Sequence, residues 1–314
     1  MTPTALNHPI YTDEKAACEH LANIRWPSVI TCPRCGVEGQ ARALGGESMG
    51  PGWFYCGACQ DKFTVRTGTV YERSHIPLHK WLLGFRLMAS SKKGISAHQL
   101  HRTLGITYKS AWFMAHRIRE AMSDTDPSPL GGKDKTVEVD ETFRGEPNYV
   151  FVSGKGWRKK SGTSSKTKVL TLVERNGKAR SMVIAEVKAK EIAPLVERHV
   201  AKETTLMTDE GKWYTNVGKK FAAHETVHHS RKEYARGKTH TNTVEGFFSI
   251  FKRGMVGTYQ HCGEQHLKRY LQEFDFRYSN RAALGVDDAE RTERAVKGAE
   301  GKRLMYRRPR VSAA

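Results

Sequence analysis

The alternation of apolar and polar residues divides the chain into a helical first half and a mixed second half. Apolar side chains recur at helical spacing from residue 78 (Leu78, Trp81, Leu82, Phe85 and Met88), which predicts an amphipathic helix. From residue 136 onward apolar residues alternate with polar ones, as in 137–142, which is typical of a strand. This change of period, in a chain of 314 residues, predicts more than one domain.

The helical half continues with two further predicted helices. Ser96 is expected to cap a short helix that ends at Gly105, and a basic helix follows over 106–119. A short helix, a turn with glycine and a basic helix form the helix-turn-helix pattern. An ordinary helical bundle between two domains is the alternative. The second helix would present these residues to a DNA major groove: Tyr108, Lys109, Ser110 and either His116 or Arg117.

The second half predicts a mixed sheet flanked by helices. A hairpin is expected to turn at Asn176-Gly177, a pair that favours a type I′ turn. Residues 123–134 are rich in Pro, Gly and Asp and are predicted to form a linker. The other predicted elements are strands at 137–142, 168–175, 179–187 and 204–208, a helix at 190–200, and a helix that begins near a capping Thr241 or Thr243.

Four of the six cysteines form two Cys-x-x-Cys pairs, separated by 20 residues. This spacing is that of a structural zinc site with four thiolate ligands. Gly36 and Gly57 are expected to supply the backbone freedom of the two tight turns. A redox pair is the alternative, but it would need a thioredoxin-like βαβ context that the sequence lacks. The predicted zinc ligands are Cys32, Cys35, Cys56 and Cys59.

The charge of the chain indicates a polyanionic partner. Lys and Arg outnumber Asp and Glu by 52 to 33, which gives +19 and favours double-stranded DNA. Residues 152–168 hold six basic residues and no acidic one, so Lys159 and Lys160 are expected DNA contacts. No long apolar stretch or secretory signal is seen, so we expect no membrane association. The expected location is the cytoplasm, at the bacterial nucleoid.

Three acidic residues stand where catalytic carboxylates would be useful. Asp140 lies in a strand pattern, Asp209 ends an apolar run, and Glu245 lies near a helix start. Two strands and a helix can bring such acids together around two Mg²⁺ or Mn²⁺ ions, a pair that cleaves phosphodiesters. Asp140 would bridge both ions. Lys252 follows two helical turns after Glu245 and, with Arg253, is expected to contact phosphate.

The pentapeptide 224–228 offers a competing interpretation. Its sequence, His-Glu-x-x-His, matches the zinc metalloprotease motif, which requires a helix. Thr226 and Val227 are β-branched, and the segment falls where a strand is expected, so we favour a strand. His228, His229 and His240 are then expected to pack around the acids or meet phosphates.

The order of these parts resembles the DDE transposases of bacterial insertion sequences, in particular the insertion-sequence 1595 family with an N-terminal zinc ribbon. The most specific stretches are 137–142, 240–254 and 266–281. The resemblance implies an RNase H-like catalytic fold, Mg²⁺ dependence, binding to transposon terminal repeats, and a homo-oligomer that joins two ends. It also implies roles for Asn242 and Lys252. Whether Asn242 or Glu245 is the third metal ligand stays open, and we favour the carboxylate as the stronger ligand for a hard cation.

The sequence therefore predicts a multidomain DNA transposase. The expected domains are a zinc ribbon at 10–75, helix-turn-helix helices at 76–123, an RNase H-like α/β catalytic domain at 133–285, and a basic tail at 286–314. The expected activity is two-metal-ion strand cleavage and strand transfer. The alternatives are a nuclease of the same fold without strand transfer, and a DNA-binding regulator whose acids are structural.

Overall fold

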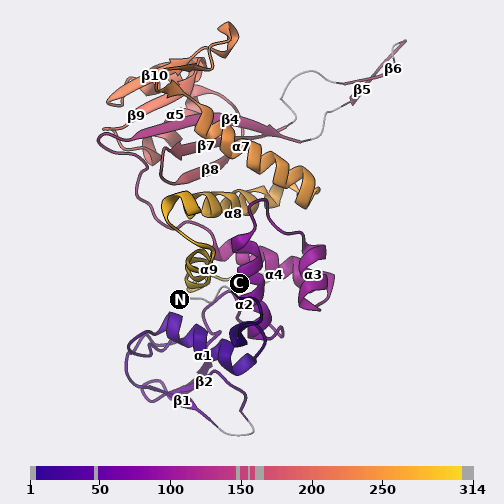
Figure 1. Ribbon diagram of the computed structural model, residues 1–314, viewed down its shortest axis with the longest axis vertical. Helices are drawn as coiled ribbons and strands as arrows, with labels where there is room; N and C mark the ends of the chain where they lie inside the picture. The colour runs from indigo at the N-terminus through magenta and orange to yellow at the C-terminus, as the bar shows by residue number, and fades with distance from the viewer. Residues whose placement is uncertain (1–4, 46–48, 146–148, 155, 160–165, 306–314) are drawn as a thin grey trace, which may run out of the picture. The chain divides into compact units, whose positions relative to one another are not determined.

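The chain forms two compact units in the computed structural model, which describes residues 5–45, 49–145, 149–154, 156–159 and 166–305. Unit 1 combines residues 1–123 with 281–314, and unit 2 comprises residues 124–280. Figure 1 shows the elements of both. The middle of the chain is thus a self-contained unit, and the polypeptide returns to the first unit at its end.

Unit 1 begins with helix α1 (Glu14–Arg25) and a small antiparallel ribbon of strands β1 (Ala41–Leu44), β2 (Trp53–Cys56) and β3 (Asp61–Thr64). The core of the ribbon is aromatic. The Trp26 ring meets the rings of Phe54 and Phe63 edge-on, at centroid distances of 5.1 and 5.9 Å. Phe54 and Phe63 stack on each other. These three rings supply the apolar contacts that so short a ribbon needs.

Three helices follow the ribbon, as the periodicity predicts: α2 (Leu78–Ser90), α3 (Ala97–Leu104) and α4 (Tyr108–Ala121). The predicted cap of α3 is confirmed, because Ser96 Oγ accepts a hydrogen bond from the backbone N–H of Gln99 at 3.1 Å. Gly105 ends the helix in the left-handed region, with φ 58°. The Thr107 side chain then caps α4. Local sequence signals therefore fix the turn between α3 and α4.

The C-terminal segment corrects one expectation. Residues 288–297 were expected within a basic tail, but they form helix α9 (Asp288–Lys297) in unit 1. Asp287 caps this helix, and its buried face includes Ala295 and Val296. Arg291 is buried as well and donates to the backbone carbonyls of Ala89 and Val286. The segment is highly charged, so the prediction from the sequence missed its narrow apolar stripe, which is sufficient for packing.

Unit 2 is built on a five-stranded mixed sheet with the order β10-β9-β4-β7-β8. Strands β4 and β7 pair antiparallel, as do β7 and β8, whereas β4, β9 and β10 run parallel. The strand bounds are β4 (Thr136–Arg144), β7 (Thr167–Glu174), β8 (Ala179–Ile184), β9 (Thr205–Asp209) and β10 (Ala223–Val227). The mixed sheet predicted from the sequence is confirmed.

Both faces of this sheet are covered. Helix α5 (Ala189–His199) packs on one face, where Val137 and Val139 of β4 join its core. Helices α7 (Asn242–Gly254) and α8 (Leu267–Ser279) pack on the other, against Val169 and Val173 of β7. Figure 1 shows α7 and α8 on the same side of the strands. Side chains alternate along a strand, so the even-numbered residues of β4 face α7.

The predicted hairpin of β7 and β8 is present, but its turn differs from the expectation. A type I′ turn needs positive φ at both central residues. Asn176 has φ 54°, whereas Gly177 does not have a positive φ. Residues 224–227 lie in strand β10 and His228 directly follows it, so the segment is not a helix and the two histidines do not form the metalloprotease arrangement.

None of the helices in the described ranges is long and apolar enough to cross a bilayer.

Unit 2 also contains several short elements. The short elements are strands β5 (Tyr149–Val152), β6 (Gly156–Lys159), β11 (Ala235–Arg236) and β12 (Thr239–His240), helix α6 (Thr215–Gly218), the 3₁₀ turns η2 (Lys212–Tyr214), η3 (His229–Arg231) and η5 (Glu264–His266), and the π-helical turn η4 (Met255–Tyr259).

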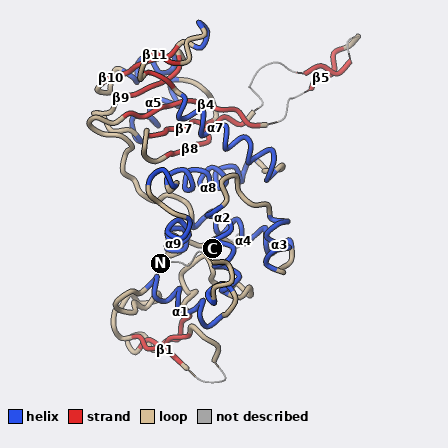
Figure 2. The backbone as a smooth tube through the Cα atoms, viewed as in Figure 1, coloured by secondary structure: helices blue, strands red, loops and turns tan. Residues whose placement is uncertain are grey.

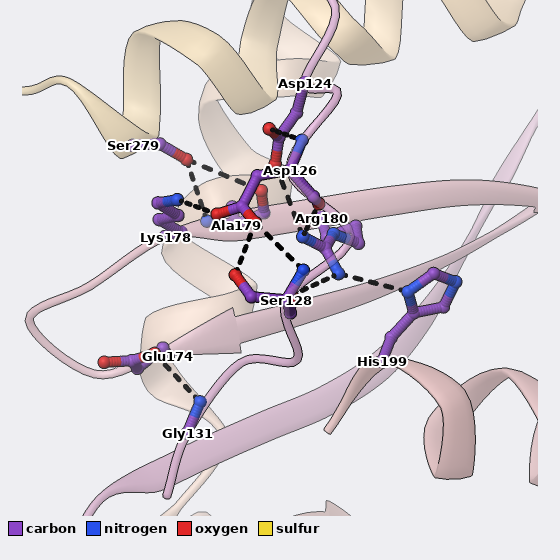
Figure 3. Close-up of polar contacts among 10 residues, drawn as sticks. All are labelled: Asp124, Asp126, Ser128, Gly131, Glu174, Lys178, Ala179, Arg180, His199 and Ser279. Atoms are coloured by element: carbon purple, nitrogen blue, oxygen red, sulfur yellow. Dashed lines mark hydrogen bonds and ion pairs between the residues drawn. The ribbon is translucent and has the colours of Figure 1, made fainter. Parts of the chain in front are cut away.

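The predicted linker is fastened to unit 2 along the start of β8 (Figure 3). Arg180 donates to the backbone carbonyls of Asp126 and Ser128, both at 3.1 Å, and pairs with Asp124 at 3.3 Å. Lys178 pairs with the Asp126 carboxylate at 2.9 Å. The first residues of the linker therefore belong structurally to unit 2.

Candidate functional site

The four predicted zinc ligands lie together in the ribbon. Their sulfur atoms all lie within 4.8 Å of one another, and Cys32–Cys59 and Cys35–Cys56 are 3.8 and 3.7 Å apart. Four Zn–S bonds of about 2.3 Å in a tetrahedron place the sulfurs about 3.8 Å apart. The cluster therefore has the geometry of a structural zinc site. A site closed by four thiolates has no open position for catalysis.

Of the two turns that hold these cysteines, the first uses the expected glycine and the second does not. Gly36 follows the first pair with φ 76°, as predicted. After the second pair, the left-handed residue is Gln60, with φ 56°, and Gly57 has no positive φ. Gly57 instead donates its N–H to the carbonyl of Gln40. In each turn the residue with positive φ directly follows the second cysteine of the pair: Gly36 after Cys35, and Gln60 after Cys59. The prediction from the sequence chose Gly57, which follows the first cysteine of the second pair.

Strand register places the two predicted catalytic aspartates side by side. The last paired residues of the parallel strands β4 and β9 are Glu138 and Met207. Asp140 and Asp209 each lie two residues beyond that pair, so they stand level where the strands separate. Side-chain alternation directs both to the face that α7 covers. Glu245 lies in the first turn of α7.

Burial, together with the negative charges of Asp209 and Glu245, raises the pKa of Asp140 to about 7, against a hydrogen bond from the Glu141 N–H and the positive charge of Lys252. Burial also raises the pKa of Asp209, against a hydrogen bond from Gly211 N–H. Neighbouring carboxylates with raised pKa values are stabilised by a bound cation.

The start of α7 is held by a carboxylate from β4. Glu138 is completely buried and accepts hydrogen bonds from the backbone N–H groups of Thr243 and Val244, at 2.8 and 3.0 Å. It also accepts from Thr243 Oγ1 at 2.7 Å and pairs with Arg175 at 2.6 Å. Thr241 occupies the N-cap position of α7, as one of the two predicted alternatives has it, but its side chain makes no capping hydrogen bond. Glu138 caps the helix from across the unit and thereby positions Glu245.

Two further acids border the site. Glu141 accepts hydrogen bonds from Trp213 Nε1, at 3.0 Å, and from the Tyr214 hydroxyl, and burial raises its pKa to about 8. Glu210 accepts the backbone N–H groups of Ser230 and His229, and these hydrogen bonds lower its pKa to about 2. Both acids accept hydrogen bonds from neighbouring donors beside the site.

The other predicted site residues on α7 are accessible. Asn242 is the exposed first residue of the helix, and Thr241 Oγ1 donates to the Glu245 carboxylate at 2.8 Å. Lys252 is exposed, and its Nζ lies 5.9 Å from the centroid of the Phe248 ring. Arg253 is also exposed but bends back to donate to the Ser249 carbonyl and hydroxyl.

A cleft opens beside Asp209 along strand β10. Its volume is about 590 Å³, and Lys219, His224 and His228 contribute to its lining. The His224 ring contacts Thr208 Oγ1 at 2.9 Å. Both histidines of the 224–228 segment line this cleft together with Asp209.

The predicted DNA contacts of unit 1 differ in accessibility. Tyr108 is 44% exposed at the start of α4, its ring stacks on His98, and Lys109 is exposed beside it. Ser110 is partly buried. Arg117 is only 8% exposed and donates to the carbonyls of three residues that lie far from it in the chain: Val70, Glu72 and Leu304. Arg117 is therefore a structural residue, and predicting it as a DNA contact was wrong. The alternative, His116, is buried as well.

The basic stretch at 152–168 is only partly described. Lys159 ends strand β6, for which the backbone alone is described at this position, and Lys160 lies outside the described residues. Arg158 is exposed on β6, and Phe151 on the paired strand β5 is 65% exposed. The two predicted lysine contacts remain predictions.

Comparison with known proteins identifies the family. Residues 12–62 match the transposase zinc-ribbon domain, and residues 129–279 match the ISXO2-like transposase domain. A protein of Halobacterium salinarum, described as an uncharacterized protein in transposable element ISH50, is 26% identical over 281 residues, which cover 85% of this chain and 91% of that protein. The matched segments contain the cysteine cluster and the three acids. The chain therefore belongs to the insertion-sequence 1595 family of transposases, whose members carry an N-terminal zinc ribbon.

Proposed function

We propose that this transposase binds the terminal inverted repeats of its element and catalyses strand cleavage and strand transfer with Asp140, Asp209 and Glu245. The single observation that carries this proposal is the level position of the two aspartates on the adjacent parallel strands β4 and β9, just beyond the last paired residues and facing the helix of the third acid. The negative charges of Asp209 and Glu245 contribute to the raised pKa of Asp140, which supports the same grouping.

The donor set fits hard divalent cations, because all three ligands are carboxylates. In the described ranges, acidic residues form no group of three with ligand atoms as close together as those of the cysteines. When bound, a pair of Mg²⁺ or Mn²⁺ ions activates the attacking oxygen and stabilises the leaving oxygen of a phosphodiester.

The protein's own groups prepare the site in three ways. Burial raises the pKa of Asp140 to about 7, and a cation held by its carboxylate would favour the ionised form. Glu138 fixes the start of α7, so that Glu245 is held in position. Lys252, on the same helix, offers an exposed ammonium group to a phosphate. Asn242 is the alternative third ligand, and its place at the start of α7 is compatible with that role.

We further propose that unit 2 has the RNase H-like fold. Three antiparallel strands followed by two parallel ones, with helices on both faces, agree with that expectation. In unit 1 we propose that the start of α4 contacts DNA, because Tyr108 and Lys109 are exposed there. Assembly as a homo-oligomer that joins two ends remains part of the proposal.

The decisive experiment measures strand-specific cleavage of terminal-repeat DNA by the full chain in Mg²⁺. Asp140→Asn and Asp209→Asn should abolish cleavage and leave DNA binding intact in a mobility-shift assay. Glu186→Gln is the matched control, because it removes a carboxylate that is 52% exposed and outside the acid group. Cleavage by both aspartate variants at the wild-type rate would refute the assignment.

A nuclease without strand transfer is the second candidate, since the same carboxylates and cations serve hydrolysis and transfer. Supplying precleaved ends with a free 3′-hydroxyl and a target plasmid separates the two. Joined products support transfer, whereas hydrolysis alone supports the nuclease. A regulator without catalysis would bind the ends and show neither reaction.

A further inference from the structure

The segment 228–240, called the basic loop here, connects β10 to α7 and borders the acid group. It contains η3 and the small hairpin of β11 and β12. Figure 2 shows β11 beside β10 at one end of unit 2. A single acid, Glu233, accompanies four exposed basic residues in this loop: Arg231, Lys232, Arg236 and Lys238. The loop therefore presents a positive surface next to the site where a phosphodiester is expected to react.

The basic loop is fixed by the elements that carry the acids. Glu210, which follows Asp209, accepts the N–H groups of His229 and Ser230 at 2.8 and 2.9 Å. Arg175 donates to the carbonyls of Lys238 and His240 at 2.8 and 2.9 Å. These bonds hold both ends of the loop. A loop so anchored presents its exposed side chains in a fixed position relative to the acids.

Tyr234 is the exposed aromatic residue of this loop. Its side chain is 58% exposed, and its ring lies 5.3 Å from that of His229. His229 Nε2 in turn lies 3.7 Å from a Glu245 carboxylate oxygen. A single exposed aromatic residue needs no explanation by itself. Here the Tyr234 ring contacts His229, which in turn lies beside the proposed catalytic acid Glu245. The four exposed basic residues of the loop stand close to Tyr234 in the sequence.

We propose that the basic loop binds the DNA strand beside the reacting phosphate, and that Tyr234 stacks on an unpaired base of that strand. Proteins that bind single strands combine a positive surface with aromatic rings on which bases stack. Paired bases inside a duplex offer no free face, so the ligand is an unpaired or frayed base at a DNA end. The position of the loop at the reaction site rests on the proposed function, but strand binding itself does not require cleavage.

The test uses the full zinc-containing chain in Mg²⁺-free buffer. The probe is a short duplex with a single-stranded overhang that carries 2-aminopurine, whose fluorescence is quenched by stacking, and a blunt duplex of the same sequence serves for comparison. Tyr234→Leu should weaken overhang binding by about fivefold or more, the lower end of the effect of removing one base–aromatic stack. It should also abolish the quenching, while Tyr234→Phe retains both.

Phe151→Leu is the matched control, since Phe151 is a similarly exposed aromatic residue of the same unit, located on β5 outside the basic loop. An unchanged affinity and quench in Tyr234→Leu would overturn the proposal, as would an equal loss in Phe151→Leu or an equal loss on the blunt duplex. A parallel Mg²⁺ cleavage assay separates the two proposals. Tyr234-dependent overhang binding without cleavage would leave the basic loop assignment standing and refute the proposed function.

Discussion

Replacing Glu138 by alanine should detach the start of α7 and destabilise unit 2. The buried carboxylate accepts four hydrogen bonds, from Thr243 N and Oγ1, Val244 N and Arg175 Nε. Hydrogen bonds to a charged group contribute about 1.5–3 kcal/mol each. Their sum overstates the loss, because removing the carboxylate also removes the cost of burying it. Breaking a buried ion pair by deleting one partner costs about 3–5 kcal/mol, and we expect a loss of that size.

The effect can be measured as thermal unfolding of the full chain. For a unit of this size, about 3–5 kcal/mol corresponds to a fall in melting temperature of roughly 6–20 °C. Cleavage should fall as well, because Glu245 follows the released turn. Glu203→Ala is the control, since it removes an exposed carboxylate of the same unit and should change stability by less than about 0.5 kcal/mol. A Glu138→Ala protein that melts like the control would refute the capping role.

Three further predictions concern the zinc site, the DNA surface and pH. Cys35→Ser should lose the bound zinc and unfold the ribbon, because structural zinc contributes about 10–16 kcal/mol, more than the net stability of a small domain. Metal analysis of this variant checks the prediction, with Cys262→Ser, which should keep its zinc, as the control. Arg117→Ala should lower the free energy of unfolding by about 2–4 kcal/mol without changing the salt dependence of DNA binding. Lys109→Ala should leave the melting temperature unchanged and reduce the slope of log affinity against log salt concentration by about 1. The opposite pattern would show that Arg117 contacts DNA. Burial raises the pKa of Asp275 to about 7, so the folded state holds a proton that the unfolded chain loses near pH 4, and this carboxyl should reduce stability by up to about 4 kcal/mol as pH rises from about 4 to 7. The stability of Asp275→Asn relative to wild type should therefore increase over that range in denaturant titrations, and a constant difference would contradict the assignment.

Local sequence signals predicted much of this architecture because the relevant contacts are local. Ser96 and Gly105 bound α3 as expected, since caps and left-handed turns depend on a few neighbouring residues. The strands that carry Asp140 and Asp209 were predicted because their apolar patterns are visible in the sequence. Their convergence was inferred from chemistry, and strand register then placed the two side chains level.

The errors arose where distant segments decide the role of a residue. Helical periodicity identifies the apolar face of α4, but it does not reveal that Val70 and Leu304 provide carbonyls to Arg117. The hydrogen bonds that cap α7 come from Glu138, 105 residues before Thr243, whereas the prediction from the sequence considered only threonines at the start of the helix. Both cases involve a charged residue whose burial depends on tertiary contacts rather than on its neighbours in the chain.

The contacts of the linker have a consequence for how the protein could have been assembled and could be taken apart. Asp124 and Asp126 at the entry to unit 2, and Ser279 at its exit, all contact residues 178–180 (Figure 3). The two crossings between the units therefore lie next to each other. A segment whose ends meet in this way can be inserted into a host domain without separating the host's own parts. We therefore expect that replacing unit 2 by a brief glycine-serine bridge from Ser123 to Arg281 leaves the zinc-containing host able to fold by itself.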